Sequence, residues 1–252
     1  MFKEGVYLDG YVVRSVEESA ELELLQSPYV YRTVRCANFQ PEDSAAEAAE
    51  LNGYFEKVFG RRSAVTADEL ARAVRNLLTR NHYPNQAVNV EVRLYASAER
   101  AVLCAVAGKL LLCDHYEPAI IRPAAKECSV EVPVPECFTS FGRQVMNLTP
   151  LKNGEVRLVR QAGRLVSCEG FPLWGVVDNH VVSLTPWQSV ESRRAQEVFR
   201  RAGVSVVEGI EVDESKLTEL FYFATNELVS VGRAWGRVLE PFVAFRLADY
   251  LW

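Results

Sequence analysis

The sequence has few of the residues that hold metals or build disulfide frameworks. Its 252 residues include only three histidines, and its six cysteines are scattered without a Cys-x-x-Cys pair. Cysteines scattered in this way usually serve as small, buried apolar residues. We therefore expect neither a metal site nor a disulfide framework.

Long apolar runs and an excess of positive charge are also absent. No stretch approaches the ~20 apolar residues that a membrane helix needs, and charges interrupt the first apolar run, unlike a secretory signal. The formal net charge of −5 argues against a general nucleic-acid binder, because such a protein needs a basic face. We expect a cytoplasmic globular protein with neither membrane nor nucleic-acid partners.

Four short apolar runs lie close together between residues 155 and 186, and turn-forming residues separate them. Gly163 and Asn179 suit tight hairpins because both tolerate positive φ, so the pattern predicts an antiparallel meander. Between the hairpins, residues 169–172 predict a break in the ladder, because Pro172 has no backbone N–H. We expect a functional site at that break.

The first half of the chain combines strand and helix patterns. Residues 28–35 alternate as a strand, with Tyr31 and Arg32 on opposite faces. Capping-box spacings at Ser44 and Thr66 predict two amphipathic helices, and residues 88–95 and 101–107 predict strands that these helices cover. The patterns predict a small α/β lobe over residues 1–118. A larger β-rich lobe with helices follows over residues 119–252.

The order of motifs in the second half resembles the class IV aminotransferases, a pyridoxal-phosphate fold that also includes aminodeoxychorismate lyase. The motifs that carry this resemblance are Gly163, Glu169, Thr185-Pro186, the helix 192–202, Val207-Glu208, the short helix 215–220 and Thr225-Asn226-Glu227-Leu228. In the first half, residues 32–35 resemble the end of the family's Phe-Glu-Thr-x-Arg strand. The resemblance implies a two-lobed α+β fold whose larger lobe is an antiparallel meander or barrel. It also implies a homodimer and an inter-lobe cleft for a small anionic amino or keto acid.

Pyridoxal phosphate needs an amine for a Schiff base, donors for its phosphate and a carboxylate beside its pyridine nitrogen. The lysines nearest to the expected position of the amine are Lys126 and Lys152, and the resemblance implies Lys126 as the better candidate. It implies Glu169 as the carboxylate, although the family's usual spacing from Gly163 would select Ser167. It implies Thr225, Asn226 and Arg35 as further cofactor-binding residues. Each of these residues also has an explanation that involves no cofactor. Lys126 would be a surface lysine and Glu169 a solvated turn glutamate. Thr225 and Asn226 would belong to a loop after a buried strand, and Arg35 to a surface ion pair.

Two departures from the family bear on activity. Residues 133–143, where the lysine is expected, contain none. The family's His-x-x-Arg-Leu has no counterpart in residues 48–54, where Glu50 would repel a phosphate. One hypothesis is therefore a class IV aminotransferase-like protein that has lost pyridoxal-phosphate chemistry. The alternative is an active aminotransferase or lyase, and a third interpretation is a structural dimer that buries Trp235, Phe242 and Trp252.

Overall fold

The computed structural model describes residues 5–13, 19–85, 88–98, 100–107, 123–129, 138–208, 212–225 and 227–251. The chain divides into two compact units. Unit 1 comprises Met1–His115 with Val134–Arg143, and unit 2 comprises Tyr116–Pro133 with Gln144–Trp252. The predicted boundary at residue 118 lies outside the described residues and stays a prediction. No described helix is both long and apolar enough to cross a membrane.

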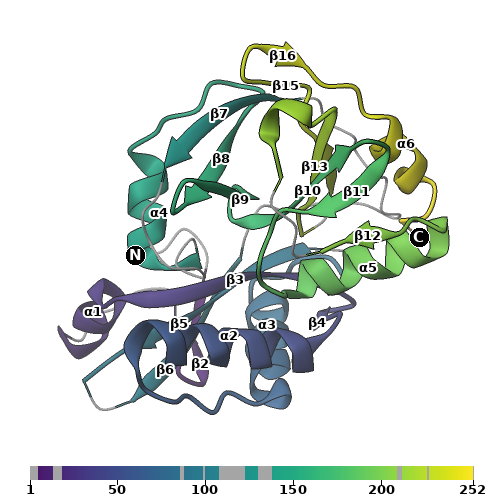
Figure 1. The fold of residues 1–252 in the computed structure, drawn as a ribbon. Coiled ribbons are helices and arrows are strands. Elements are labelled where there is room, and N and C mark those ends of the chain that lie inside the picture. The colour runs from purple at the N-terminus through teal and green to yellow at the C-terminus, as the bar shows by residue number, and fades with distance from the viewer. Residues whose placement is uncertain are drawn as a thin grey trace. The chain divides into compact units, whose positions relative to one another are not determined.

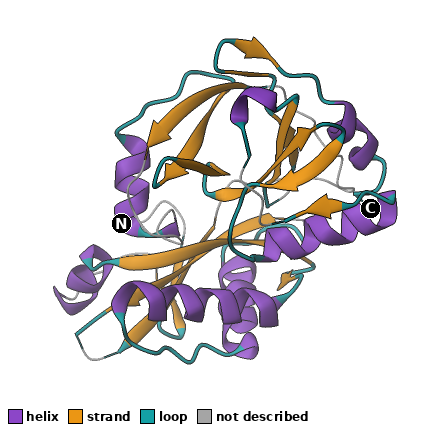
Figure 2. Cartoon of the chain, in the orientation of Figure 1, coloured by secondary structure: helices purple, strands orange, loops and turns teal. Residues whose placement is uncertain are grey.

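Unit 1 is an antiparallel sheet with helices (Figures 1 and 2), and its strands follow the order β2-β1-β6-β5-β3-β4. The strands are β1 (Val6–Leu8), β2 (Tyr11–Val13), β3 (Tyr29–Ala37), β4 (Gln40–Pro41), β5 (Val88–Ala96) and β6 (Ala101–Ala107). The helices are α1 (Ser19–Gln26), α2 (Ser44–Phe59), α3 (Ala67–Arg80) and the start of α4 (Ser140–Asn147). Side chains of β3 alternate between buried and half-buried, as period-two patterning predicts.

The helices α2 and α3 end much as the sequence predicts, but one cap differs. Thr66 and Glu69 form the expected capping box of α3, and Gly60 ends α2 in the left-handed conformation. The predicted Ser44 cap is wrong, because Asp43 accepts the hydrogen bond from the Ala46 N–H instead. Helix α1 was not predicted.

Unit 2 is a ten-stranded mixed sheet in the order β12-β11-β10-β9-β8-β7-β15-β16, and β13 pairs with both β10 and β14. Its strands are β7 (Ala124–Ser129), β8 (Glu155–Gln161), β9 (Arg164–Cys168), β10 (Phe171–Val177), β11 (His180–Ser183), β12 (Val206–Val207), β13 (Glu219–Phe223), β14 (Leu228–Ser230), β15 (Arg233–Ala234) and β16 (Arg237–Val238). Its helices are α5 (Val190–Ala202), α6 (Phe242–Ala248) and the 3₁₀ helix η2 (Glu214–Lys216).

The predicted meander is β8 to β11, and every turn in it has two residues. Ala162-Gly163 and Asp178-Asn179 have positive φ at both positions, which confirms the two predicted hairpins. Glu169-Gly170 forms a third such turn, with φ of 52° and 88°. The predicted break is therefore wrong: β9 and β10 also form a hairpin, and Pro172 tolerates its place near the start of β10.

Two apolar clusters hold unit 2 together on opposite faces of β10 and β13. One contains Leu173 and Tyr222 together with Leu158 of β8. The other contains Trp174 and Phe221, and helices α5 and α6 cover it. Figure 1 shows both helices beside the strands of this unit. A sheet with two apolar faces explains why its strands read as nearly continuous apolar runs.

Candidate functional site

In unit 1, residues 138–143 are fixed against β3; they belong to the segment in which the family resemblance predicts a Schiff-base lysine. Thr139 forms a β-bridge with Val30, and the Tyr29 N–H donates to Ser140 Oγ at 3.3 Å. The Thr139 hydroxyl accepts a hydrogen bond from the Gly142 N–H at 2.8 Å, which stabilises the first turn of α4. These contacts fix residues 138–143 in unit 1.

The described part of that segment offers an aromatic ring and no amine. Phe138 is buried, and its ring lies parallel to that of Tyr54, with 5.8 Å between centroids. The Tyr31 ring meets Phe138 edge-on at 5.8 Å, and Arg32 Cζ lies 5.3 Å from the Phe138 centroid. Residues 138–143 contain no lysine.

On the helix-facing side of β3, one buried arginine forms ion pairs with two glutamates of α2. Arg32 Nε lies 3.2 Å from Glu47 Oε2, and Arg32 Nη1 lies 3.2 Å from Glu50 Oε1. The Arg32 and Glu47 side chains are 1% exposed, and that of Glu50 is 8% exposed. The Tyr54 hydroxyl also donates to Glu50. This helix face therefore presents carboxylates, already bound by Arg32, where the family resemblance would place a phosphate-binding arginine.

The opposite face of β3 and β5 carries a second cluster, which we call the Glu91 clamp: Glu91, Arg93, Arg143, Tyr29 and Tyr31. Arg143 Nη1 and Nη2 donate to the two Glu91 carboxylate oxygens at 3.1 and 2.8 Å, and Arg93 Nε donates to Glu91 at 2.5 Å. Arg143 Cζ lies 3.8 Å from the Tyr31 ring centroid, and Arg93 Cζ lies 4.9 Å from that of Tyr29. Such packing on aromatic rings fixes the direction of each guanidinium.

The clamp shifts the protonation equilibria of its members. Burial alone would raise the pKa of Glu91, but the hydrogen bond from Arg143 and the charge of Arg93 outweigh it, so the pKa lies below its ordinary value. The pKa values of Arg93 and Arg143 are raised. Burial alone would lower them, but the interaction with the Glu91 carboxylate outweighs the effect of burial. All three groups are therefore charged at neutral pH. The predicted Arg35 lies on the same face, but its Nε pairs with Glu42 at 3.0 Å.

In unit 2, the Glu169 carboxylate is hydrogen-bonded to Arg157 of the neighbouring strand β8. Its carboxylate accepts from the Arg157 backbone N–H and, at 2.8 Å, from Arg157 Nη1. The alternative position, Ser167, is fully buried, and its hydroxyl has no hydrogen-bond partner among the described residues. A serine hydroxyl is neutral, so it could not hold a proton on a pyridine nitrogen as a carboxylate does.

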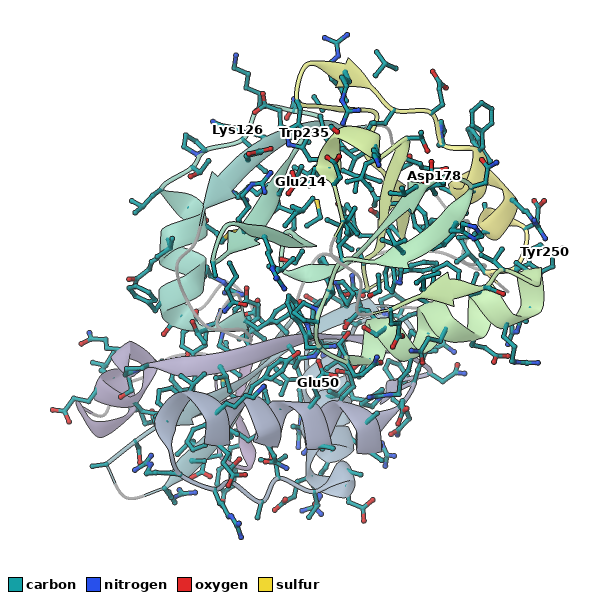
Figure 3. The ribbon with its side chains drawn as sticks, viewed as in Figure 1. Glu50, Lys126, Asp178, Glu214, Trp235 and Tyr250 are labelled. Carbon is teal, nitrogen blue, oxygen red and sulfur yellow. The ribbon has the colours of Figure 1, made fainter. Side chains whose placement is uncertain are left out.

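Lys126 lies on β7 with an exposed side chain (Figure 3). Its ammonium donates to the Pro150 carbonyl at 2.9 Å. β7 pairs with β8, and Lys126 stands opposite Arg157, the residue that binds Glu169. The structure thus brings Lys126 and Glu169 to the same part of unit 2, although both have other partners. Their assignment to catalysis stays a prediction.

The predicted phosphate-binding turn is only partly described. Thr225 is buried, and its carbonyl lies 3.5 Å from Arg194 Nη1 of α5. Ser189 caps that helix by accepting from the Ser192 N–H at 3.1 Å. Asn226 lies outside the described residues, so both assignments stay predictions.

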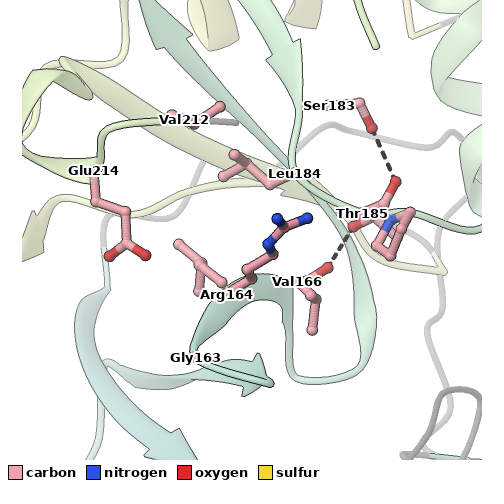
Figure 4. Close-up of a pocket in the computed structure, with 10 residues that line it drawn as sticks. Gly163, Arg164, Val166, Ser183, Leu184, Thr185, Val212 and Glu214 are labelled. Carbon is pink, nitrogen blue, oxygen red and sulfur yellow. Dashed lines mark hydrogen bonds between the residues drawn. The ribbon is translucent and has the colours of Figure 1, made fainter. Parts of the chain in front are cut away.

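The Gly163 and Thr185-Pro186 motifs line one pocket of unit 2, with a volume of about 430 Å³. The Thr185 hydroxyl donates to the Val166 carbonyl at 2.6 Å (Figure 4). It also accepts from the Leu173 N–H at 2.7 Å. Arg164 points into this pocket, and Glu214 on another wall is held by Arg160. Thr185 therefore joins β9, β10 and the segment after β11, which is a structural role.

No protein-family model and no curated protein matches the sequence. Among solved structures, the chain is similar to the branched-chain aminotransferase of the archaeon Thermoproteus uzoniensis with norvaline. The identity is 15%, the TM-score is 0.76, and the match covers 98% of this chain and 93% of that one. The chain has the class IV aminotransferase fold.

Two further structures with this fold agree. A putative branched-chain amino acid aminotransferase from Thermotoga maritima is 13% identical with a TM-score of 0.73, over 98% of this chain and 94% of that one. A Brucella abortus aminotransferase bound to pyridoxal phosphate is 16% identical with a TM-score of 0.70, over 98% and 97%. The expected two-lobed α+β class IV aminotransferase-like fold is thereby confirmed.

The sequence reasoning missed both clusters of unit 1. Strand alternation placed Arg32 and Tyr31 on opposite faces of β3, which is correct. The same rule places Glu91 and Arg93 on one face of β5, so this pair of the five clamp residues could have been predicted from the sequence. Arg143 was not, because its place depends on the bridge between Thr139 and Val30.

Proposed function

We propose that this chain is a class IV aminotransferase-fold protein that does not carry out pyridoxal-phosphate chemistry and instead binds a small anionic amino or keto acid. The observation that carries the proposal is the buried ring of Phe138, in the segment where the family resemblance predicts a Schiff-base lysine. A phenyl ring cannot form a Schiff base.

The other residues that would serve the cofactor support the same proposal. Ser167 offers a neutral hydroxyl at the position that the family's spacing selects for the pyridine partner, and Arg157 already binds Glu169. On α2, Glu50 lies where an arginine would be needed for the phosphate, and a buried carboxylate there would repel a phosphate. These residues do not fit pyridoxal phosphate, so we derive no reaction step through it.

The proposal is tested by adding pyridoxal phosphate to the purified full chain, recording the absorption spectrum and treating the mixture with borohydride. We expect no absorption band at the visible edge to stay with the protein once unbound cofactor is removed, and no lysine to be modified in stoichiometric amount. The alternative, an active aminotransferase or lyase, predicts a yellow protein in which borohydride reduces a Schiff base and links the cofactor covalently to Lys126. In that case Lys126→Met would lose the band, while Lys152→Met, at an exposed lysine of a loop, would keep it.

We also propose that the chain forms a homodimer. Val238, Phe242 and Phe245 expose 60%, 78% and 53% of their surface, which is high for large apolar side chains. Trp235 is half-buried under Arg237, whose Cζ lies 5.4 Å from its ring, and Trp252 lies outside the described residues. Sedimentation equilibrium should give twice the chain mass, and Phe242→Ser should shift it toward the single chain. A monomeric wild-type protein would remove this proposal.

A further inference from the structure

The Glu91 clamp is built like a carboxylate-binding site whose ligand comes from the chain itself. Arg143 grips both Glu91 oxygens, and Arg93 adds a third hydrogen bond at 2.5 Å. A bidentate arginine with a second charge-assisted donor is a strong and specific way to hold a carboxylate. Tyr29 and Tyr31 pack against the two guanidinium groups and orient them.

The clamp also retains an excess of positive charge. Two guanidinium groups face one carboxylate, so one positive charge is left uncompensated within the cluster. The side chains are not sealed in the interior: Glu91 is 19% exposed, Arg93 23% and Arg143 29%. Both arginine side chains are therefore partly accessible to solvent.

We infer that Arg93 and Arg143 bind the carboxylate of a small organic acid, and that Glu91 is an internal competitor that the ligand must displace. This inference rests on the proposed function, because it names the site and the ligand chemistry of that anion binding. The ligand class is a monocarboxylate with a compact apolar body, since the surroundings of the two arginines include the tyrosine rings. The exchange involves no covalent step: one carboxylate replaces another.

Competition with an internal group predicts a measurable signature. A carboxylate held on the same strand as Arg93 has an effective concentration in the millimolar range or above, so it weakens the binding of a free acid. Removing its charge without changing its size should therefore strengthen binding. Arg93 and Arg143 would then bind the free acid without a competitor.

The test is calorimetric titration of the full chain with isovalerate, a small branched carboxylate, and with its neutral amide isovaleramide. We expect Glu91→Gln to bind isovalerate about tenfold more tightly than the wild type, which corresponds to roughly 1.4 kcal/mol. Glu91→Asp keeps the charge on a shorter side chain and should give an intermediate affinity. The affinity for isovaleramide should not increase in either variant relative to the wild type.

Two further variants complete the design. Glu42→Gln is the matched control, because it removes the partner of Arg35 on the same unit and should leave isovalerate binding at the wild-type level. Adding Arg143→Gln to Glu91→Gln should abolish the increase in affinity for isovalerate. The inference is overturned if Glu91→Gln binds isovalerate no more tightly than Glu42→Gln does, or if the amide gains equally.

The two proposals fail in different experiments. A yellow protein whose cofactor is linked covalently to a lysine after borohydride treatment would overturn the proposed loss of cofactor chemistry. It would leave the Glu91 titrations unaffected. If Glu91→Gln does not fold, the Glu91→Asp titration still decides, because an affinity equal to that of the wild type contradicts competition by the carboxylate.

Discussion

The rings of Phe138 and Tyr54 lie within 4° of parallel, with their centroids 5.8 Å apart. Tyr54 belongs to α2, and Phe138 comes from a segment far along the chain that returns to unit 1. Arg32 lies beside both rings, with its Cζ 5.9 Å from the Tyr54 centroid and 5.3 Å from the Phe138 centroid. This stack therefore links the two parts of the chain that make up unit 1.

Replacing Phe138 with alanine should destabilise the protein strongly. The side chain is only 6% exposed, and large-to-small changes at such positions cost about 3–5 kcal/mol. Urea unfolding followed by tryptophan fluorescence and circular dichroism would measure the change. Phe242→Ala, at a ring that is 78% exposed, is the control and should change the free energy of unfolding by less than about 0.5 kcal/mol in the monomer. Equal effects in the two variants would contradict the packing role.

Replacing Arg32 with methionine should cost about 3–5 kcal/mol of unfolding free energy, because Glu47 and Glu50 would remain buried without their cation. Adding Glu47→Gln and Glu50→Gln to this variant should recover part of the loss. The matched control is Arg62→Met, whose pair with Glu56 leaves the arginine side chain 90% exposed. That change should cost less than about 1 kcal/mol. No recovery in the triple variant would show that the charges are not the cause.

The fold could be predicted from the sequence wherever a local rule decides the structure. Thr66 and Glu69 lie three residues apart before an apolar period, and the capping box forms as expected. The same spacing at Ser44 and Glu47 failed, because Glu47 turns inward to Arg32 and leaves the cap to Asp43. A buried ion pair between two elements overrides a local cap worth about 1 kcal/mol.

The site was harder to predict, because its contacts join residues that are far apart in sequence. Glu91 and Arg143 are separated by 52 positions, and tertiary contacts such as the bridge between Thr139 and Val30 bring them together. Glu169 follows the same logic: its partner Arg157 lies across the β8–β9 hairpin, 12 positions away. Alternation in a strand fixes the face of a side chain, and the partner on that face depends on tertiary structure.

Replacing Gly175 with alanine should destabilise unit 2. A Cβ at this position of β10 would lie 2.3 Å from Leu217 Cδ2, closer than two carbon atoms can approach, so Leu217 would have to move. Overpacking of this kind typically costs about 1–3 kcal/mol. Gly53→Ala is the control, because no atom lies within 4 Å of its added Cβ in α2, and helix propensity favours the change by about 1 kcal/mol. Thermal unfolding should shift in opposite directions, and a Gly175→Ala protein as stable as the wild type would disprove the packing argument.

Glu219 should make the protein relatively more stable at acidic pH. It is 2% exposed, and its two carboxylate oxygens accept from the Val243 and Ala244 N–H groups, each at 2.8 Å, at the start of α6. Burial raises the pKa of Glu219 above its ordinary 4.5, and the two backbone hydrogen bonds only partly oppose it. The folded state then holds the proton more tightly than the unfolded state does. The difference in unfolding free energy between the wild type and Glu219→Gln should be most favourable to the wild type below pH 4.5 and fall as pH rises through the raised pKa.

Glu91 should show the opposite pH dependence. Burial would raise its pKa, but the hydrogen bond from Arg143 and the charge of Arg93 hold it below the ordinary 4.5. The unfolded state therefore binds the proton more tightly, so the stabilisation is fully present above pH 4.5 and is lost as pH falls through the lowered pKa. Urea unfolding of the wild type and Glu91→Gln between neutral and acidic pH should show their difference shrinking as pH falls, whereas the difference for Glu219→Gln grows. If both differences move in the same direction, the arginines do not hold the Glu91 carboxylate in its charged form, and the internal competitor proposed for the clamp is lost with it.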